Sequence, residues 1–137
     1  MGPGTYDIVT VPRARAIHQS VWTAPFSCAM CMWSCWKLLT RYTDKRGKDL
    51  PDLILCNGPA TATVLVLTSV VLRLFDVQRA STKNKMRTVY IESWARVKTL
   101  SLSGEVLRHV VDRLLVQWPK VERAYGGRVE YAGTLVN

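Results

Sequence analysis

Residues 51–61 read Pro-Asp-Leu-Ile-Leu-Cys-Asn-Gly-Pro-Ala-Thr, and this stretch determines how the rest of the chain can be arranged. The apolar run at 53–56 is typical of a buried strand, which Asn57, Gly58 and Pro59 end with a turn. An apolar segment at 60–75 follows and predicts a helix that covers the sheet. A strand that leads through a turn directly into a helix indicates an α/β fold.

The same alternation continues along the chain. Further strands are predicted at 6–11, 88–92, 114–117 and 129–131, and further helices at 20–40, 103–111 and 119–125. Short, continuously apolar strands separated by helices predict a mainly parallel, Rossmann-like sheet with helices on both faces. In such sheets the ligand lies beyond the carboxyl ends of the strands. Asn57-Gly58-Pro59 and Glu92-Ser93-Trp94 both follow predicted strands, so we expect them at one edge of the sheet.

The length and the charge of the chain limit the kinds of partner. A chain of 137 residues corresponds to a single domain, 1–137. The formal net charge is +9, which favours an anionic partner: an acidic membrane surface, a phosphorylated substrate or nucleic acid. The basic residues do not alternate with aromatic ones as they do on a single-strand stacking surface. A basic α/β module that binds nucleic acid is therefore the alternative hypothesis, and it rests on charge alone.

The cysteine spacing and an uncharged segment each suggest a special site, a metal cluster and a membrane span, but a simpler explanation accounts for each. Cys28, Cys31 and Cys35 have the spacing of a cluster ligand set, but the same spacing is one apolar face of a helix, which we favour. The uncharged segment 20–36 is interpreted as a buried or partly membrane-facing helix rather than a membrane span. No glycine-rich phosphate loop follows an early strand. We predict no metal and no cofactor.

Several separated motifs occur in the order and spacing of one family. They are the 51–59 stretch, Val-Tyr-Ile-Glu-Ser at 89–93, Arg-Val at 96–97, Leu-Ser-Leu-Ser-Gly at 100–104 and Val-Gln-Trp-Pro at 116–119. Together they resemble the membrane-anchoring subunits of the eukaryotic UDP-N-acetylglucosamine (UDP-GlcNAc) transferase. That enzyme adds the second GlcNAc to dolichol-pyrophosphate-GlcNAc during N-linked glycan precursor synthesis. The similarity runs from about residue 6 to the C-terminus.

The resemblance implies a fold and a role. It implies the acceptor-side, N-terminal half of a split GT-B glycosyltransferase, here incomplete because the family's N-terminal membrane helix and glycine-rich strand-loop-helix are absent from the sequence. It also implies a separate catalytic subunit that binds UDP-GlcNAc, and recruitment of that subunit to the cytosolic face of the endoplasmic reticulum and the continuous outer nuclear membrane. The expected partners are this subunit, the dolichol-linked acceptor and the membrane surface, without nucleic acid. The chain alone is expected to be inactive.

The resemblance also suggests site residues. The resemblance implies that Glu92 orients or deprotonates the acceptor hydroxyl, whereas the residues alone favour a structural role, in which Glu92 caps the following segment and pairs with Arg96. Asn57, Gly58 and Pro59 would approach the sugar pyrophosphate, although they also suit a plain strand-to-helix turn. Ser93 and Arg96 would contact the same substrate, with a solvated loop as the alternative for Arg96.

The C-terminal tail is the expected contact with the catalytic subunit. This expectation follows from the resemblance alone and covers the last five residues, Gly133, Thr134, Leu135, Val136 and Asn137.

Overall fold

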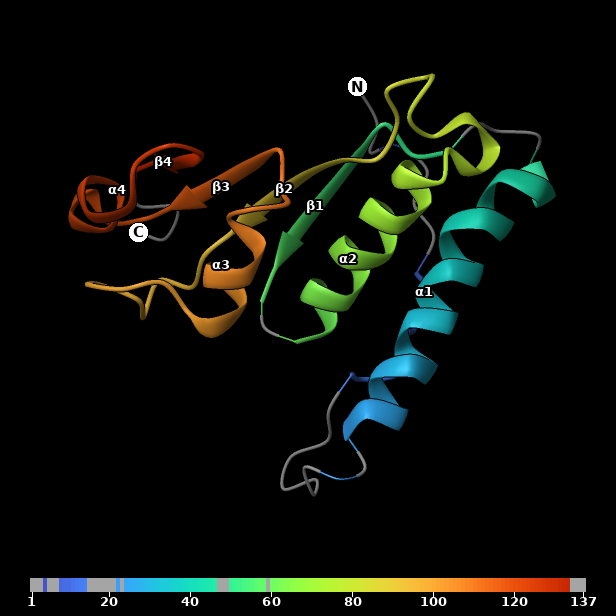
Figure 1. Cartoon of the computed structure of the whole chain (residues 1–137), viewed down its shortest axis with the longest axis horizontal. Coiled ribbons are helices and arrows are strands. Elements are labelled where there is room, and N and C mark those ends of the chain that lie inside the picture. The colour runs from blue at the N-terminus through green and yellow to red at the C-terminus, as the bar shows by residue number, and fades with distance from the viewer. Residues whose placement is uncertain are drawn as a thin grey trace.

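The computed structural model describes residues 4, 8–14, 22, 24–46, 50–58 and 60–133 (Figure 1). Four strands alternate with helices along the described chain. In order, the elements are α1 (Ala24–Arg46), β1 (Leu53–Asn57), α2 (Thr61–Leu74), the 3₁₀ turn η1 (Val77–Arg79), β2 (Arg87–Ile91), α3 (Leu102–Leu107), β3 (Arg113–Val116), α4 (Pro119–Tyr125) and β4 (Val129–Tyr131).

The strands form one parallel sheet in the order β1-β2-β3-β4. The parallel α/β sheet predicted from the sequence is thus confirmed. The register pairs Asn57 of β1 with Ile91 of β2. Because the strands are parallel and adjacent, the turn after β1 and the loop after β2 leave the sheet at the same carboxyl edge.

The two faces of this sheet differ sharply in burial. Registered partners in a parallel sheet point to the same face, so Ile54, Thr88, Leu114 and Val129 share one face, and all four are buried. On the other face Leu53 and Leu55 are 55% and 63% exposed, Arg87 and Arg113 are exposed, and Val89 is half-buried. The strand order advances in one direction, and right-handed crossovers then place α2, α3 and α4 on a single face. Among the described residues, no second helical layer covers the opposite face, where the sequence led us to expect one.

Helix α1 forms an outer layer against α2 and completes the covered side of the molecule (Figure 1). Cys31 and Cys35 are fully buried there with Val64 of α2, and all four cysteines are free thiols. Burial raises the pKa of Cys35 to about 12, so its thiol stays protonated. Cys28 is partly buried against the same cluster, so the interpretation of Cys28, Cys31 and Cys35 as one apolar helix face is confirmed.

The two fully buried polar side chains of α2, Thr68 and Ser69, form hydrogen bonds within the helix. Thr68 donates its hydroxyl hydrogen bond to the Val64 carbonyl at 2.7 Å, and Ser69 donates to the Val66 carbonyl at 2.7 Å. Because each hydroxyl bonds the preceding turn, neither residue leaves an unpaired polar group in the core. The helix can therefore be buried along most of its length.

The strand predicted at 6–11 is not formed by residues 8–11, the part of it that the structure describes. Ile8 and Val9 are exposed. A short apolar run becomes a strand only when a neighbouring strand pairs with it. The apolar pattern in the sequence was present, but it could not show whether a neighbour exists.

One carboxylate joins three elements at the amino edge of the sheet. Asp112 Oδ2 accepts hydrogen bonds from the Thr88 backbone N–H at 2.8 Å and from Arg73 Nη1, near the end of α2, at 2.9 Å. The Asp112 N–H in turn donates to Thr88 Oγ1 at 3.2 Å. Burial alone would raise the pKa of the Asp112 carboxyl, but these hydrogen bonds and the Arg73 charge outweigh it, and the pKa is lowered.

We expect Asp112→Asn to lower the free energy of unfolding by about 1–3 kcal/mol at pH 7, because it removes the charge that Arg73 and Thr88 bond. A lowered pKa in the folded state means that Asp112 stabilises the fold above its unfolded pKa of about 3.9 and that this is lost as the pH falls further. Urea unfolding at pH 7 and pH 3, followed by tryptophan fluorescence, measures both effects.

The matched control is Asp52→Asn. Asp52 pairs with Lys85 at 2.5 Å, but its side chain is 86% exposed, so we expect a change of about 0.5 kcal/mol or less. Equal losses for the two variants would show that Asp112 has no special role in joining α2, β2 and β3.

Candidate functional site

The turn after β1 is held by a tyrosine from the neighbouring strand. Gly58 has φ +116°, a conformation that residues with a side chain rarely adopt. The Tyr90 hydroxyl of β2 donates to the Gly58 carbonyl at 3.1 Å, and Asn57 is exposed beside it. The turn therefore has a fixed position at the carboxyl edge of the sheet and presents Asn57 to solvent.

Tyr90 suits this role because it remains protonated. It is almost completely buried, and burial, with a smaller contribution from the Glu92 charge, raises the pKa of its phenol. A protonated phenol keeps the hydrogen with which it bonds the Gly58 carbonyl. The contact between β2 and the turn is thus stable across the physiological pH range.

Glu92, the residue after β2, is buried and is held by neutral donors. Glu92 is only 2% exposed. Glu92 Oε1 accepts from the Ser93 N–H at 2.9 Å, and Oε2 accepts from both the N–H and the hydroxyl of Ser101, each at 2.9 Å. The carboxylate therefore binds both ends of the segment 93–101, and Ser101 lies nine residues beyond Glu92 in the chain.

Ser101 also begins helix α3, which brings the helix against the same carboxylate. Its hydroxyl oxygen accepts from the Gly104 N–H at 3.0 Å, the usual N-cap arrangement. A Cβ added at Gly104 would collide with Glu92 Oε2, so this close approach requires glycine. Glu92, Ser101 and Gly104 thus form one unit, which we call the Glu92 clamp.

The structural alternative foreseen for Glu92 combined a cap on the following segment with a pair to Arg96. The cap is formed, and the pair with Arg96 is not formed among the described residues. Arg96 is exposed, and its N–H donates to the Ser93 carbonyl at 3.1 Å. The serine hydroxyl and two backbone N–H groups bond the carboxylate instead. The guanidinium of Arg96 is consequently directed to solvent at the carboxyl edge.

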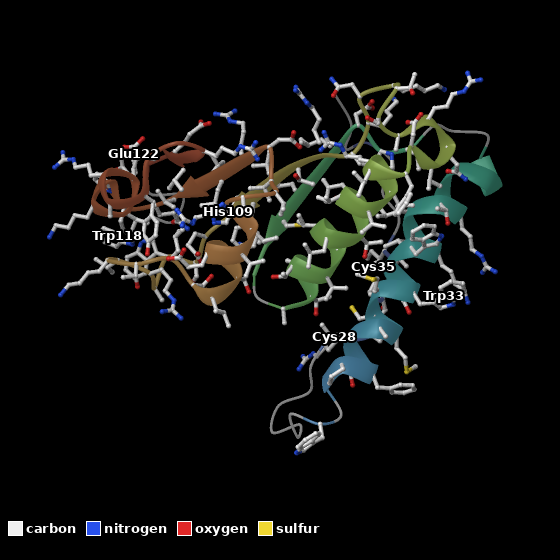
Figure 2. The ribbon with its side chains drawn as sticks, viewed as in Figure 1. Cys28, Trp33, Cys35, His109, Trp118 and Glu122 are labelled. Carbon is white, nitrogen blue, oxygen red and sulfur yellow. The ribbon has the colours of Figure 1, made fainter. Side chains whose placement is uncertain are left out.

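Two tryptophans to which the sequence analysis assigned no contact with each other, Trp94 and Trp118, lie beside this segment. Trp118 Nε1, after β3, donates to the Trp94 carbonyl at 2.8 Å, and the two rings are 5.5 Å apart between centroids (Trp118 is labelled in Figure 2). Trp94 remains half exposed, and Arg96 and Lys98 on the same loop are exposed. The only sequence signal was that both tryptophans follow the ends of adjacent strands.

The structure brings some of the predicted site residues together and leaves others undescribed. Asn57 and Gly58 lie at the end of β1, and Glu92 and Ser93 lie at the end of β2, its direct neighbour. Arg96 is on the loop that follows. Pro59 lies outside the described residues. Each of these roles remains a prediction.

The predicted partner-binding tail is almost entirely outside the described residues. Gly133, with φ +80°, follows β4, the strand farthest from β1. Thr134, Leu135, Val136 and Asn137 lie beyond the last described residue. The assignment of the tail to a partner is therefore also still a prediction.

No group of three or more histidine, cysteine or acidic residues in the described part of the chain is arranged to hold a metal ion. None of the described helices is long and apolar enough to cross a membrane.

The chain is similar to the members of one protein family over nearly its whole length. A family model described as "Oligosaccharide biosynthesis protein Alg14 like" matches residues 2–135. A protein of Aspergillus fumigatus named UDP-N-acetylglucosamine transferase subunit alg14 is 41% identical over 170 aligned positions, which cover 97% of this chain and 75% of that protein. No solved structure matches the chain.

Two further relatives carry the same name. The Schizosaccharomyces pombe protein is 42% identical over 92% of this chain, and the Mus musculus protein is 37% identical over 96% of it. The matched region is 54% of each of these two proteins, so the chain spans about half of their length.

We expect Gly104→Ala to destabilise the protein by about 1–3 kcal/mol, because the added methyl group must displace the Glu92 carboxylate from Ser101. Ala is otherwise the better helix former, so propensity alone predicts the opposite sign. The free energy of unfolding in urea measures the difference. Val106→Ala, at a half-exposed position in the same helix, is the control and should change stability by about 0.5 kcal/mol or less. A stabilising Gly104→Ala substitution would contradict the clamp.

Proposed function

The chain belongs to the Alg14 family, and from this membership we propose that it is the acceptor-side subunit of a UDP-N-acetylglucosamine transferase. The observation that carries the proposal is the family match across residues 2–135, with relatives that are named as subunits of that transferase. In this proposal the complex adds the second GlcNAc to dolichol-pyrophosphate-GlcNAc. A separate subunit supplies UDP-GlcNAc, and this chain recruits it to the cytosolic face of the endoplasmic reticulum.

The chemistry of the carboxyl edge is consistent with an acceptor that bears a pyrophosphate. Arg96 and Lys98 are exposed there, and neither forms an ion pair with another described residue. A pyrophosphate is a compact anion that such cations bind well. The Asn57-Gly58 turn lies at the same edge and offers an exposed amide side chain with little steric bulk. The half-exposed ring of Trp94 offers an apolar face to a sugar ring.

Glu92 has two possible roles in this proposal, and they predict different measurements. As a general base it would take the proton of the acceptor hydroxyl through Oε1, which accepts a single hydrogen bond from Ser93. As a positioning residue it would act through the segment 93–101, whose two ends it binds. Its burial supports the positioning role, because a base must come within hydrogen-bond distance of its substrate.

The nucleic-acid alternative receives no support beyond net charge. Several basic residues are paired with carboxylates: Arg73 with Asp112, Lys85 with Asp52, Arg108 with Glu105 and Arg113 with Glu130. Along the sequence, the basic residues do not alternate with aromatic residues as they do on a surface that stacks single-stranded nucleic acid.

Reconstitution tests the proposed function. We expect the purified chain alone to transfer no GlcNAc from UDP-GlcNAc to dolichol-pyrophosphate-GlcNAc, and a complex with the donor-binding subunit to form the chitobiosyl product. Radiolabelled product extracted into organic solvent measures the transfer. A complex that forms but remains inactive, with the donor-binding subunit shown to bind UDP-GlcNAc, would refute the proposal.

Glu92→Gln and Ser101→Ala, measured in the same complex, separate the two roles of Glu92. If Glu92 is the base, Glu92→Gln lowers kcat by about 10²–10⁴-fold and Ser101→Ala, which keeps the carboxylate, has little effect. If Glu92 positions the loop, both variants raise KM for the acceptor and speed amide hydrogen exchange in 93–101. Normal kinetics in both variants would exclude either role.

Deletion of 134–137 tests the tail. We expect the shortened chain to fold but to lose most of its affinity for the donor-binding subunit, because the tail is the predicted contact. Pull-down with purified subunits measures binding, and circular dichroism verifies the fold. Deletion of residues 1–4 serves as the control truncation. Full affinity of the tail deletion would show that the subunits meet elsewhere.

A further inference from the structure

Helix α1 has apolar side chains on two opposite sides, and the sheet domain uses only one of them. On the inner side Cys31, Cys35 and Leu39 are 0%, 1% and 7% exposed against α2 and the core. On the outer side Phe26, Met30 and Trp33 are 71%, 54% and 61% exposed. Their spacing of four and three residues places them in one stripe along the helix. Figure 2 shows Trp33 pointing away from α2, on the side of α1 opposite Cys35.

Such a stripe is unusual on a helix that faces water. A surface helix of a globular protein normally carries polar residues opposite its buried face, and a helix that is apolar all round is covered on all sides. Large apolar patches left exposed mark contact surfaces. The outer side of α1 is therefore expected to contact a partner, and the charge of this side of the helix indicates the kind of partner.

Cations continue the stripe toward the C-terminal half of the helix. Lys37 is exposed one turn beyond Trp33, with its ammonium 5.2 Å from the centroid of the Trp33 ring, and Arg41 is exposed one turn further. Residues 24–41 contain no aspartate or glutamate. A row of large apolar side chains bordered by cations, on a chain with net charge +9, complements an anionic lipid surface.

The position of the stripe also fits the proposed acceptor site. The Ala14 N–H donates to Thr61 Oγ1 at the start of α2, and the Cys28 thiol donates to the Ala14 carbonyl. This contact joins the first turns of α1 and α2, and the two helices run in parallel (Figure 1). The start of α2 follows the Asn57-Gly58 turn, so Phe26, Met30 and Trp33 lie toward the carboxyl edge of β1.

We infer that the outer stripe of α1, defined as Phe26, Met30, Trp33, Lys37 and Arg41, lies on the surface of an anionic membrane. Phe26, Met30 and Trp33 enter the boundary between headgroups and acyl chains, and Lys37 and Arg41 bind lipid phosphates. This membrane contact holds the carboxyl edge of the sheet close to the headgroup layer, where the pyrophosphate of a lipid-linked acceptor is located. That benefit of the contact rests on the proposed function. The contact is peripheral and differs from a membrane-spanning anchor.

Vesicle sedimentation of the full chain tests the inference without any sugar nucleotide. We expect binding to phosphatidylcholine vesicles that contain about a third phosphatidylserine, and much weaker binding to phosphatidylcholine alone. Phe26→Ser combined with Trp33→Ser should lower the partition coefficient at least about tenfold. Lys37→Gln should lower it about fivefold on anionic vesicles, and increased salt should weaken binding.

Two matched variants control for fold and for total charge. Phe75→Ser removes an equally exposed aromatic residue at the opposite end of α2, and Lys120→Gln removes an exposed cation from α4. We expect wild-type binding from both. Equal losses in Lys37→Gln and Lys120→Gln would overturn the inference, because net charge alone would then account for binding.

Two other occupants of the stripe would appear as distinct results. If the wild-type chain is a dimer that Phe26→Ser/Trp33→Ser converts to a monomer, and vesicles do not bind, a second copy covers the stripe and the inference fails. If the same variant loses the donor-binding subunit in pull-down while vesicle binding is unchanged, the inference also fails.

The same measurements separate this inference from the proposed function. Vesicle binding without transfer by the complex would refute the proposed function and leave this inference standing. Transfer by the complex without vesicle binding would refute this inference and leave the proposed function standing.

Discussion

The buried carboxylate of Glu92 is the constraint on which the carboxyl edge depends. An ionised carboxylate taken out of water costs several kcal/mol unless donors replace the lost water. Here the replacements are the N–H of Ser93 and the N–H and hydroxyl of Ser101, all uncharged. To supply them, the chain must leave β2, extend outward and return nine residues later to begin α3. Gly104 is needed because any side chain there would occupy the position of the carboxylate. The need to replace the lost hydration of the Glu92 carboxylate therefore determines the path of the loop 93–101.

The strand order imposes a second constraint. Because the strands advance in the order β1-β2-β3-β4, the right-handed crossovers cover one face and leave Leu53 and Leu55 exposed on the other. Every strand also ends at the same edge, so the turn after β1, the loop after β2 and Trp118 after β3 are brought together without any direct sequence relation. Tyr90 then fixes the first of these by bonding Gly58. The site is thus a consequence of topology, adjusted by two buried polar side chains.

The sequence predicted the parts of this arrangement that depend on local pattern. The apolar runs at 53–56 and 88–92, the turn at Asn57-Gly58 and the cysteine face of α1 were all visible in it, because period and turn chemistry act over a few residues. Contacts between distant residues were not visible. Arg96, four residues from Glu92, was the obvious partner in the sequence, yet Ser101 bonds the carboxylate instead. The strand at 6–11 failed for the same reason, since pairing depends on a neighbour that the run itself does not specify.

Neutral donors at Glu92 have a consequence for the electrostatics of the edge. Had Arg96 paired with Glu92, the buried carboxylate would have neutralised the guanidinium, and the loop would present little net charge. Because serine and backbone groups bond Glu92, Arg96 is not paired with it, and both Arg96 and Lys98 are exposed at the surface. A loop whose ends are fixed by a buried anion and whose exposed part is cationic suits an anionic ligand, since the ligand need not displace an internal partner. The clamp and the cations are therefore complementary parts of one arrangement: the first fixes the backbone, and the second remains available for binding.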